Sequence, residues 1–223
     1  MYTICVLSYN RLELLTITLQ TIKNTEIPYK LYIIDASTDK ATLELLKTKE
    51  NVIYYPGSNV GQAMNKAFDL IKDSGSDYGL ITADDYLYNP FWLERLYGVM
   101  RSSSDDVKLF SCHLEPLHQW NSIKALVTTE YLDYCFLRDS LPGSNWSFRT
   151  KDIDLIYPVA SKTGGEDLEV CKRLTTSGFN LAAMDLADHL GEKLSACGNQ
   201  SYKYANYKSR LEILSEFLLK NDN

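Results

Sequence analysis

The sequence predicts an α/β protein with a mostly parallel central sheet flanked by helices. Short apolar runs alternate with helical patterns through the first half of the chain, which is typical of successive strand–helix units. Polar residues stand where those apolar runs end, as they do at the ligand-binding edge of open parallel sheets. A length of 223 residues with 45% hydrophobic and 23% charged content is enough to bury a substantial core.

Each expected strand of the first half is a short apolar run followed by polar or turn-forming residues. These runs lie at 2–8, 31–34, 52–54, 78–82 and 108–112. Each expected helix carries apolar residues three and four positions apart, which places them on one face. The helices lie at 12–22, 39–46, 61–72 and 90–101. Ser37 or Thr38 is expected to cap the second helix and Asn89, before Pro90, the fourth, because side-chain oxygens accept bonds from exposed backbone N–H groups.

The second half is less regular. Residues 114–143 have mixed periodicity and are predicted as longer loops with one short helix or strand. A helix is expected at 166–176, ended by Gly178, and a strand at 180–185. Apolar residues between 204 and 218 have the spacing of an amphipathic helix. No linker or internal repeat is visible, so we predict a single domain over 1–223.

Composition excludes several classes of partner. The net charge of -6 and the pI near 5.1 argue against a broad nucleic-acid or anionic-lipid footprint. The five cysteines are widely spaced and form no C-x-x-C pair, which favours buried free thiols in a reducing compartment. The apolar start of the chain is too short for a signal peptide or a membrane span. We therefore expect a cytoplasmic protein with no transmembrane segment.

Polar residues follow four of the expected strands. They are Ser8, Asn10 and Arg11 after the first, Asp35 after the second, Asn59 and Gly61 after the third, and Asp84 and Asp85 after the fourth. Because the carboxyl ends of parallel strands lie at one edge of a sheet, these residues are expected to converge on one crevice.

Asp84 and Asp85 carry the strongest chemical signal of this group. Two adjacent carboxylates at the end of an apolar strand repel each other unless a cation or a proton lies between them. Mg²⁺ or Mn²⁺ would resolve the conflict, since these ions bind through one or two carboxylates together with substrate phosphates. The alternative is an exposed pair that caps the helix near Pro90, and the two residues by themselves leave both interpretations open.

The whole pattern resembles the family 2 glycosyltransferases. The matching segments, in order, are Leu7-Ser8-Tyr9-Asn10-Arg11, Ile34-Asp35-Ala36-Ser37-Thr38-Asp39, Asn59-Val60-Gly61, Ala83-Asp84-Asp85, Gly165-Glu166-Asp167 and His189-Leu190-Gly191. Each segment is weak alone, and six in the expected order over nearly the full chain are specific. The resemblance implies a GT-A fold with the nucleotide-sugar site at the carboxyl ends of the strands. Within the single domain we expect a nucleotide-binding half at 1–112 and an acceptor and catalytic half at 113–198, followed by the C-terminal helix at 199–223.

The resemblance also implies a role for each site residue. The donor would be a nucleoside-diphosphate sugar, with a UDP-sugar favoured. Asp35 would bond its base, and the rest of the donor site would be formed by Ser8, Asn10, Arg11, Asn59, Gly61 and Asp84. Mn²⁺ or Mg²⁺ would be held by Asp84 and Asp85, with His189 completing its ligands. The family's acidic motif often begins with an Asp where this chain has Ala83, so the sequence leaves open which carboxylate binds the metal.

Glu166 and Asp167 open a helix, where the helix dipole stabilises their charged forms. Helix starts often carry acidic residues for this reason alone. In the resembled family the pair supplies a general base, which takes the proton of the acceptor hydroxyl, and we assign that role to Asp167. Inversion at the anomeric carbon follows from the resemblance. Trp146 is expected either to line the acceptor site or to lie in the core.

The acceptor is not identified: a glycan, a glycolipid precursor, a protein and a modified nucleobase are all open, and so is a homodimer. A pyrophosphorylase would need a Gly-rich loop after the first strand, which is absent. No G-x-G-x-x-G, G-x-S-x-G or H-E-x-x-H is present, which excludes other common enzyme classes. The remaining alternative is a catalytically idle nucleotide-sugar-binding or scaffold module of the same fold, supported only by Ala83.

Overall fold

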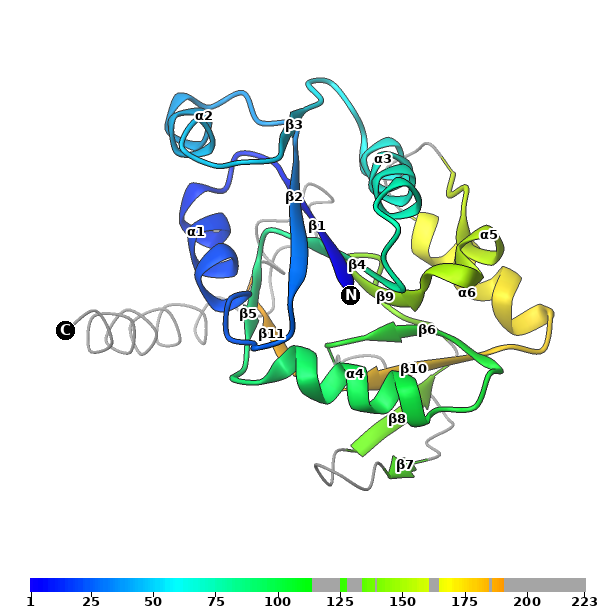
Figure 1. The fold of residues 1–223 in the computed structure, drawn as a ribbon. Coiled ribbons are helices and arrows are strands. Elements are labelled where there is room, and N and C mark those ends of the chain that lie inside the picture. Colours follow the sequence, from blue (N-terminus) through cyan, green and yellow to red (C-terminus); the bar gives the residue numbers. More distant parts are fainter. Residues whose placement is uncertain (114–124, 128–133, 139, 161–164, 185, 191–223) are drawn as a thin grey trace.

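The computed structural model describes residues 1–113, 125–127, 134–138, 140–160, 165–184 and 186–190 (Figure 1). Its elements are β1 (Tyr2–Ser8), α1 (Leu12–Thr21), β2 (Tyr29–Asp35), α2 (Lys40–Leu46), β3 (Val52–Tyr54), α3 (Val60–Asp73), β4 (Tyr78–Ala83), β5 (Tyr86–Tyr88), α4 (Trp92–Ser102), β6 (Val107–Ser111), β7 (Ala125–Val127), β8 (Tyr134–Arg138), β9 (Asn145–Arg149), η1 (Thr150–Asp152), α5 (Ile153–Ile156), α6 (Glu166–Thr176), β10 (Asn180–Met184) and β11 (Ala187–His189).

One sheet organises the described chain. Its strand order is β3-β2-β1-β4-β9-β6-β10-β8-β7, and β9 and β8 run against the other strands. The predicted α/β class with a mostly parallel sheet is therefore confirmed. Because β9 is antiparallel to β4, with Asn145 opposite Thr82, the start of β9 lies at the edge where β4 ends. A separate two-stranded sheet pairs β5 with β11.

The two faces of the large sheet are covered by different helices (Figure 1). Apolar side chains of α1 and α4 pack in one buried cluster with Ile4 and Val6 of β1, whereas α3, α5 and α6 pack in a second cluster with Cys5. This alternation along β1 is required in a strand buried on both faces, because successive side chains point to opposite sides. The core thus holds the strands rigidly while their carboxyl ends stay available for a site.

Several helix boundaries differ from the expected ones for local reasons. Asp39, rather than Ser37 or Thr38, caps α2, since its carboxylate accepts a hydrogen bond of 2.8 Å from the Thr42 backbone N–H. Helix α4 begins at Trp92, two residues later than predicted, because Phe91 adopts a left-handed φ of 58°. The predicted C-terminal helix lies outside the described residues.

Some short elements were not expected from the sequence. They include the strands β5, β9 and β11 and the helix α5. The irregular segment 114–143, for which one short helix or strand was expected, contains the strands β7 and β8. Strands β5, β7 and β11 have three residues each, too few for an alternating pattern to stand out. Among the described residues, no helix has the length and apolar character needed to cross a bilayer.

Candidate active site

The loop after β1 is tied to the loop after β2 through Asn10. Its side-chain oxygen accepts hydrogen bonds from the backbone N–H groups of Thr38, at 2.7 Å, and Asp39, at 3.0 Å. Its own backbone N–H donates to the Ser37 hydroxyl at 2.8 Å. Asn10 has a φ of 52°, a left-handed conformation that Asn tolerates better than most residues. The predicted convergence of the first two strand ends is therefore present, and Asn10 holds it together.

Ser8 and Asp35 lie opposite each other in the register of β1 and β2. Both side chains are buried. One oxygen of Asp35 accepts from the Ser37 hydroxyl at 2.6 Å, but its other oxygen and the Ser8 hydroxyl have no hydrogen-bond partner in the described chain. Buried polar atoms without partners are rare, and those in native sites call for an explanation such as a ligand or water. These two atoms suit a ligand with polar groups at this edge.

Arg11 lies between the two carboxylates that directly follow β4. Its guanidinium forms ion pairs with Asp84 Oδ1 and Asp85 Oδ2. Asp84 Oδ2 also accepts from the Tyr9 backbone N–H at 3.0 Å. His189 Nε2 lies 3.2 Å from Asp85 Oδ2. Both carboxylates are buried, so these residues form a dense charged cluster, which we call the acidic centre.

The small β5–β11 sheet positions His189 in this cluster. His189 pairs with Tyr86 across the two strands, and their rings stack with centroids 4.8 Å apart. The next residue, Leu190, donates its backbone N–H to the Asp85 carbonyl at 2.8 Å. The predicted closeness of His189 to the acidic pair is therefore observed, and Asp85 is the member of the pair that its ring contacts.

Electrostatics make the two carboxyls unequal. Burial raises the pKa of Asp84 to about 7; Arg11 opposes this rise and Asp85 adds to it. Burial also acts to raise the pKa of Asp85, but His189 and then Arg11 outweigh it and hold that pKa below its ordinary value. Asp85 is thus the stably ionised member, and an added cation would stabilise the charged form of Asp84 as well.

The acidic centre has the donor atoms that a hard divalent cation uses. Asp85 Oδ1 is buried with no hydrogen-bond partner in the described part of the chain, and the two carboxylates are the ligand type that Mg²⁺ and Mn²⁺ prefer. In the described ranges, no three or more His, Cys, Asp or Glu side chains are arranged as a ready-made metal cage. The residues fit a cation whose other ligands are phosphate oxygens and water.

Asp167 approaches the same edge of the sheet from α6. Its Oδ2 accepts from the Gly143 backbone N–H at 3.3 Å, and its Oδ1 from Leu168 N–H at 2.7 Å. The next residue, Ser144, contacts the end of β4, because its carbonyl accepts a hydrogen bond from Ala83 N–H at 2.7 Å. Residues 143 and 144 therefore join the first turn of α6 to the end of β4. The preceding residue in α6, Glu166, is buried.

This connecting segment was not expected from the sequence, although Pro142-Gly143 is a recognised turn dipeptide. Arg11 was expected to bind only the donor, and not the acidic pair. The contacts of residues 143 and 144, and those of Arg11 with the acidic pair, join residues far apart in the chain, which local patterns do not reveal.

Three predicted site residues have structural roles. Asn59 caps α3 through reciprocal bonds with Gln62, at 2.9 and 3.0 Å, and Gly61 is buried in the first turn of that helix. Trp146 is fully buried in the second core cluster, on β9. An acceptor cannot stack on a side chain without exposed surface, so the expectation that Trp146 lines the acceptor site is wrong and its core alternative is correct.

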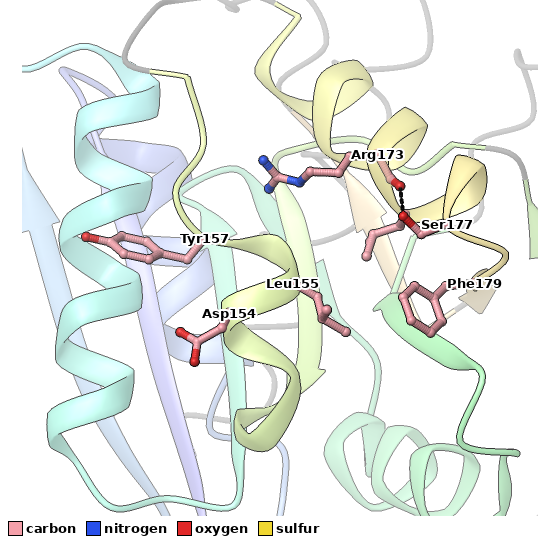
Figure 2. Close-up of a pocket in the computed structure, with 7 residues that line it drawn as sticks. Asp154, Leu155, Tyr157, Arg173, Ser177 and Phe179 are labelled. Atoms are coloured by element: carbon pink, nitrogen blue, oxygen red, sulfur yellow. Dashed lines mark hydrogen bonds between the residues drawn. The ribbon is translucent and has the colours of Figure 1, made fainter.

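A pocket of about 270 Å³ lies elsewhere, between α5 and α6 (Figure 2). It is lined by Asp154, Leu155, Tyr157, Arg173, Leu174, Ser177 and Phe179. None of these residues belongs to the acidic centre or to the Asp167 turn. The candidate site is therefore the side-chain cluster at the strand ends and not this pocket.

A sheet of this order, with an acidic centre after β4, is the GT-A fold. Solved structures agree on the fold. The mannosyltransferase PcManGT from Pyrobaculum calidifontis, in complex with GDP-Man and Mn²⁺, aligns with a TM-score of 0.58 at 14% identity, over 82% of this chain and 56% of that chain. GalNAc-T7 with UDP, GalNAc and Mn²⁺ aligns with a TM-score of 0.63 at 11% identity, over 84% of this chain and 43% of that chain. S. aureus TarS 1–349 aligns with a TM-score of 0.57 at 14% identity, over 86% of this chain and 61% of that chain.

The family is shown by the sequence profile of Glycosyl transferase family 2, which matches residues 3–156. The chain belongs to this family. A comparison with curated proteins gave no match. The chain spans about half the length of the solved structures to which it is similar, between 43% and 61% of those three chains.

Proposed function

We propose that this chain transfers a sugar from a nucleoside-diphosphate sugar to an acceptor hydroxyl, with inversion and with the help of Mn²⁺ or Mg²⁺. The observation that carries the proposal is the link through residues 143 and 144, which ties the first turn of α6, with the carboxylate of Asp167, to the end of β4, which the acidic centre follows. Family membership supports the reaction class, and the Mn²⁺ in two of the similar structures supports the metal.

The donor occupies the nucleotide-binding half, residues 1–112, in this proposal. The unpartnered oxygen of Asp35 and the Ser8 hydroxyl receive polar groups of the nucleoside, while Asn10 fixes the loops around them. Arg11 is the cation available for the diphosphate. A UDP-sugar remains the favoured donor, and UDP and GDP-Man are the nucleotide ligands of the similar structures.

The second half, residues 113–198, supplies the base. Asp167 accepts the proton of the acceptor hydroxyl, the acceptor oxygen bonds to the anomeric carbon, and the bond to the donor phosphate breaks with its electron pair leaving on the diphosphate. Gly143 N–H orients the Asp167 carboxylate for this role. A divalent cation held by Asp84 and Asp85 would stabilise the negative charge of the leaving diphosphate.

Release of nucleoside diphosphate from a panel of UDP-, GDP- and dTDP-sugars tests the proposal, with water as the acceptor while the natural acceptor is unidentified. We expect release with Mn²⁺ and loss of at least about a hundredfold in Asp85→Ala and Asp167→Asn, the range typical of acid–base and electrostatic contributions. Glu169→Gln, an exposed carboxylate on the same helix, is the matched control and keeps full activity. Absence of release from every donor, with nucleotide still bound, would favour the idle module.

A further inference from the structure

The guanidinium of Arg11 already neutralises the pair of carboxylates that the proposed metal would use. It contacts one oxygen of Asp84 and one of Asp85, and its side chain is only 19% exposed. A divalent cation approaching these carboxylates meets a positive charge a few ångströms away. Two cations at such a separation repel each other strongly in a poorly solvated site, so this arrangement weakens metal binding.

The carboxylates do not depend on Arg11 alone for their positions. Asp84 is also held by the Tyr9 backbone N–H, and Asp85 by His189. The guanidinium, in contrast, makes hydrogen bonds and ion pairs within the described chain only with these two carboxylates. Arg11 can therefore leave by a change of its side-chain rotamers, while the carboxylates stay in place.

The backbone of Arg11 stays fixed during such a change, because its carbonyl accepts the first helical bond of α1 from Leu15 N–H at 2.8 Å. Only the side chain has to move. An arginine fork binds two phosphate oxygens as well as it binds two carboxylates, so a diphosphate that enters this edge offers the guanidinium an equivalent partner.

We propose that Arg11 is a displaceable counter-ion, which keeps the acidic centre closed to divalent cations until the diphosphate of the donor draws the guanidinium away from Asp84 and Asp85. The diphosphate then provides the ligands that the carboxylates lack, and metal and nucleotide bind cooperatively. This inference rests on the proposed function in taking a nucleoside diphosphate as the ligand and Asp84 and Asp85 as the residues that hold the metal. It assigns Arg11 as a positioning residue that couples the two binding events.

Mn²⁺ binding, followed by the electron paramagnetic resonance signal of the free ion, tests the proposal directly on the full chain. The wild-type protein should bind Mn²⁺ weakly by itself and at least about tenfold more tightly with saturating UDP or GDP. In Arg11→Gln, the nucleotide-free protein should bind Mn²⁺ at least about tenfold more tightly than wild type, because a repelling unit charge is gone. Added nucleotide should then strengthen metal binding less than it does in wild type.

Two further variants keep the test decisive. Arg101→Gln removes an exposed positive charge in the last turn of α4 and should leave Mn²⁺ affinity unchanged. Arg11→Lys keeps the charge without the two-pronged geometry and should give an intermediate affinity, which can be read even if Arg11→Gln does not fold.

Equal Mn²⁺ affinity in wild type, Arg11→Gln and Arg11→Lys, or a wild-type affinity that nucleotide does not change, overturns the counter-ion role. Donor hydrolysis is measured on the same samples. Hydrolysis without the predicted Mn²⁺ differences overturns this inference but leaves the proposed function intact. An Arg11-dependent Mn²⁺ affinity in a protein that hydrolyses no donor would support this inference and contradict the proposed function.

Discussion

Gly143→Ala is the most direct perturbation of the proposed base that leaves its carboxylate in the chain. A Cβ built on Gly143 would lie 2.8 Å from the Cβ of Asp167. Carbon atoms pack at about 3.5–4.0 Å, so either the first turn of α6 or the segment before β9 has to move by roughly 0.7–1.2 Å. The obstructing atom lies next to the helix backbone, and a rotamer change of Asp167 cannot remove the contact.

A displacement of about 1 Å at a reacting group can lower a rate by roughly a hundredfold. We therefore expect Gly143→Ala to lower the kcat of donor turnover by about ten- to a hundredfold, with a smaller effect on nucleotide affinity. The assay is nucleoside diphosphate release with Mn²⁺, together with thermal unfolding to correct for the folded fraction.

Gly79→Ala is the matched control. Its added Cβ would meet Ile71 at 2.8 Å and Phe148 at 2.9 Å, an equally close contact in the core. Overpacking of this kind costs about 1–3 kcal/mol of stability. Turnover per folded molecule should be unchanged in this variant. Wild-type kcat in Gly143→Ala, or an equal loss per folded molecule in both variants, would refute the positional argument.

Three other predictions concern the interior. Lys108→Met leaves the buried carboxylate of Asp152, 2.9 Å from Lys108 in the wild type, without its charge partner. The free energy of unfolding, measured with urea, should fall by about 3 kcal/mol, and a fall below about 1 kcal/mol would contradict a buried pair. Tyr88→Phe removes the hydroxyl between Thr82 and Asn145, at 2.8 and 2.9 Å, and should cost about 1–3 kcal/mol by the same assay, whereas unchanged stability would exclude a tight network. In a Cys197→Ser variant, the four remaining thiols are buried and should react with a thiol reagent only after urea unfolds the chain; they are those of Cys5, Cys112, Cys135 and Cys171. Fast labelling of the folded protein would contradict their burial.

The strand–helix alternation was readable because each unit has its own apolar period. The strands and helices of 2–83 match the structure closely, with shifts of a few residues at their ends. The strand β9 was not recognised, although its alternating Trp146 and Phe148 carry a strand pattern, because the same pattern also suited an acceptor site. Burial decides between these interpretations, and burial is a property of the folded chain.

The site was predictable in part for the same reason. The ends of β1, β2 and β4 lie at one edge of the sheet as those of parallel strands must, so the placement of Asn10, Asp35 and Asp84 at one edge was predicted from position alone. The charge balance of the acidic centre could not be predicted from the sequence. Adjacent carboxylates indicated a missing cation, and nothing in the local sequence distinguishes a metal from Arg11, whose side chain reaches them only after folding.

The reversed direction of β9 has a consequence for how this protein could be altered. A parallel strand at that position would end at the edge where β4 ends, and its hydrogen-bonded partners would constrain the loop after it. Here the turn before the strand lies at that edge, with Gly143 and Ser144 as its last two residues. Loops tolerate changes of length and sequence better than paired strands do. Exchanges within this turn would therefore change the surface next to the proposed reaction while the paired strands keep their hydrogen bonds, except at Leu141, which is buried in the second core cluster.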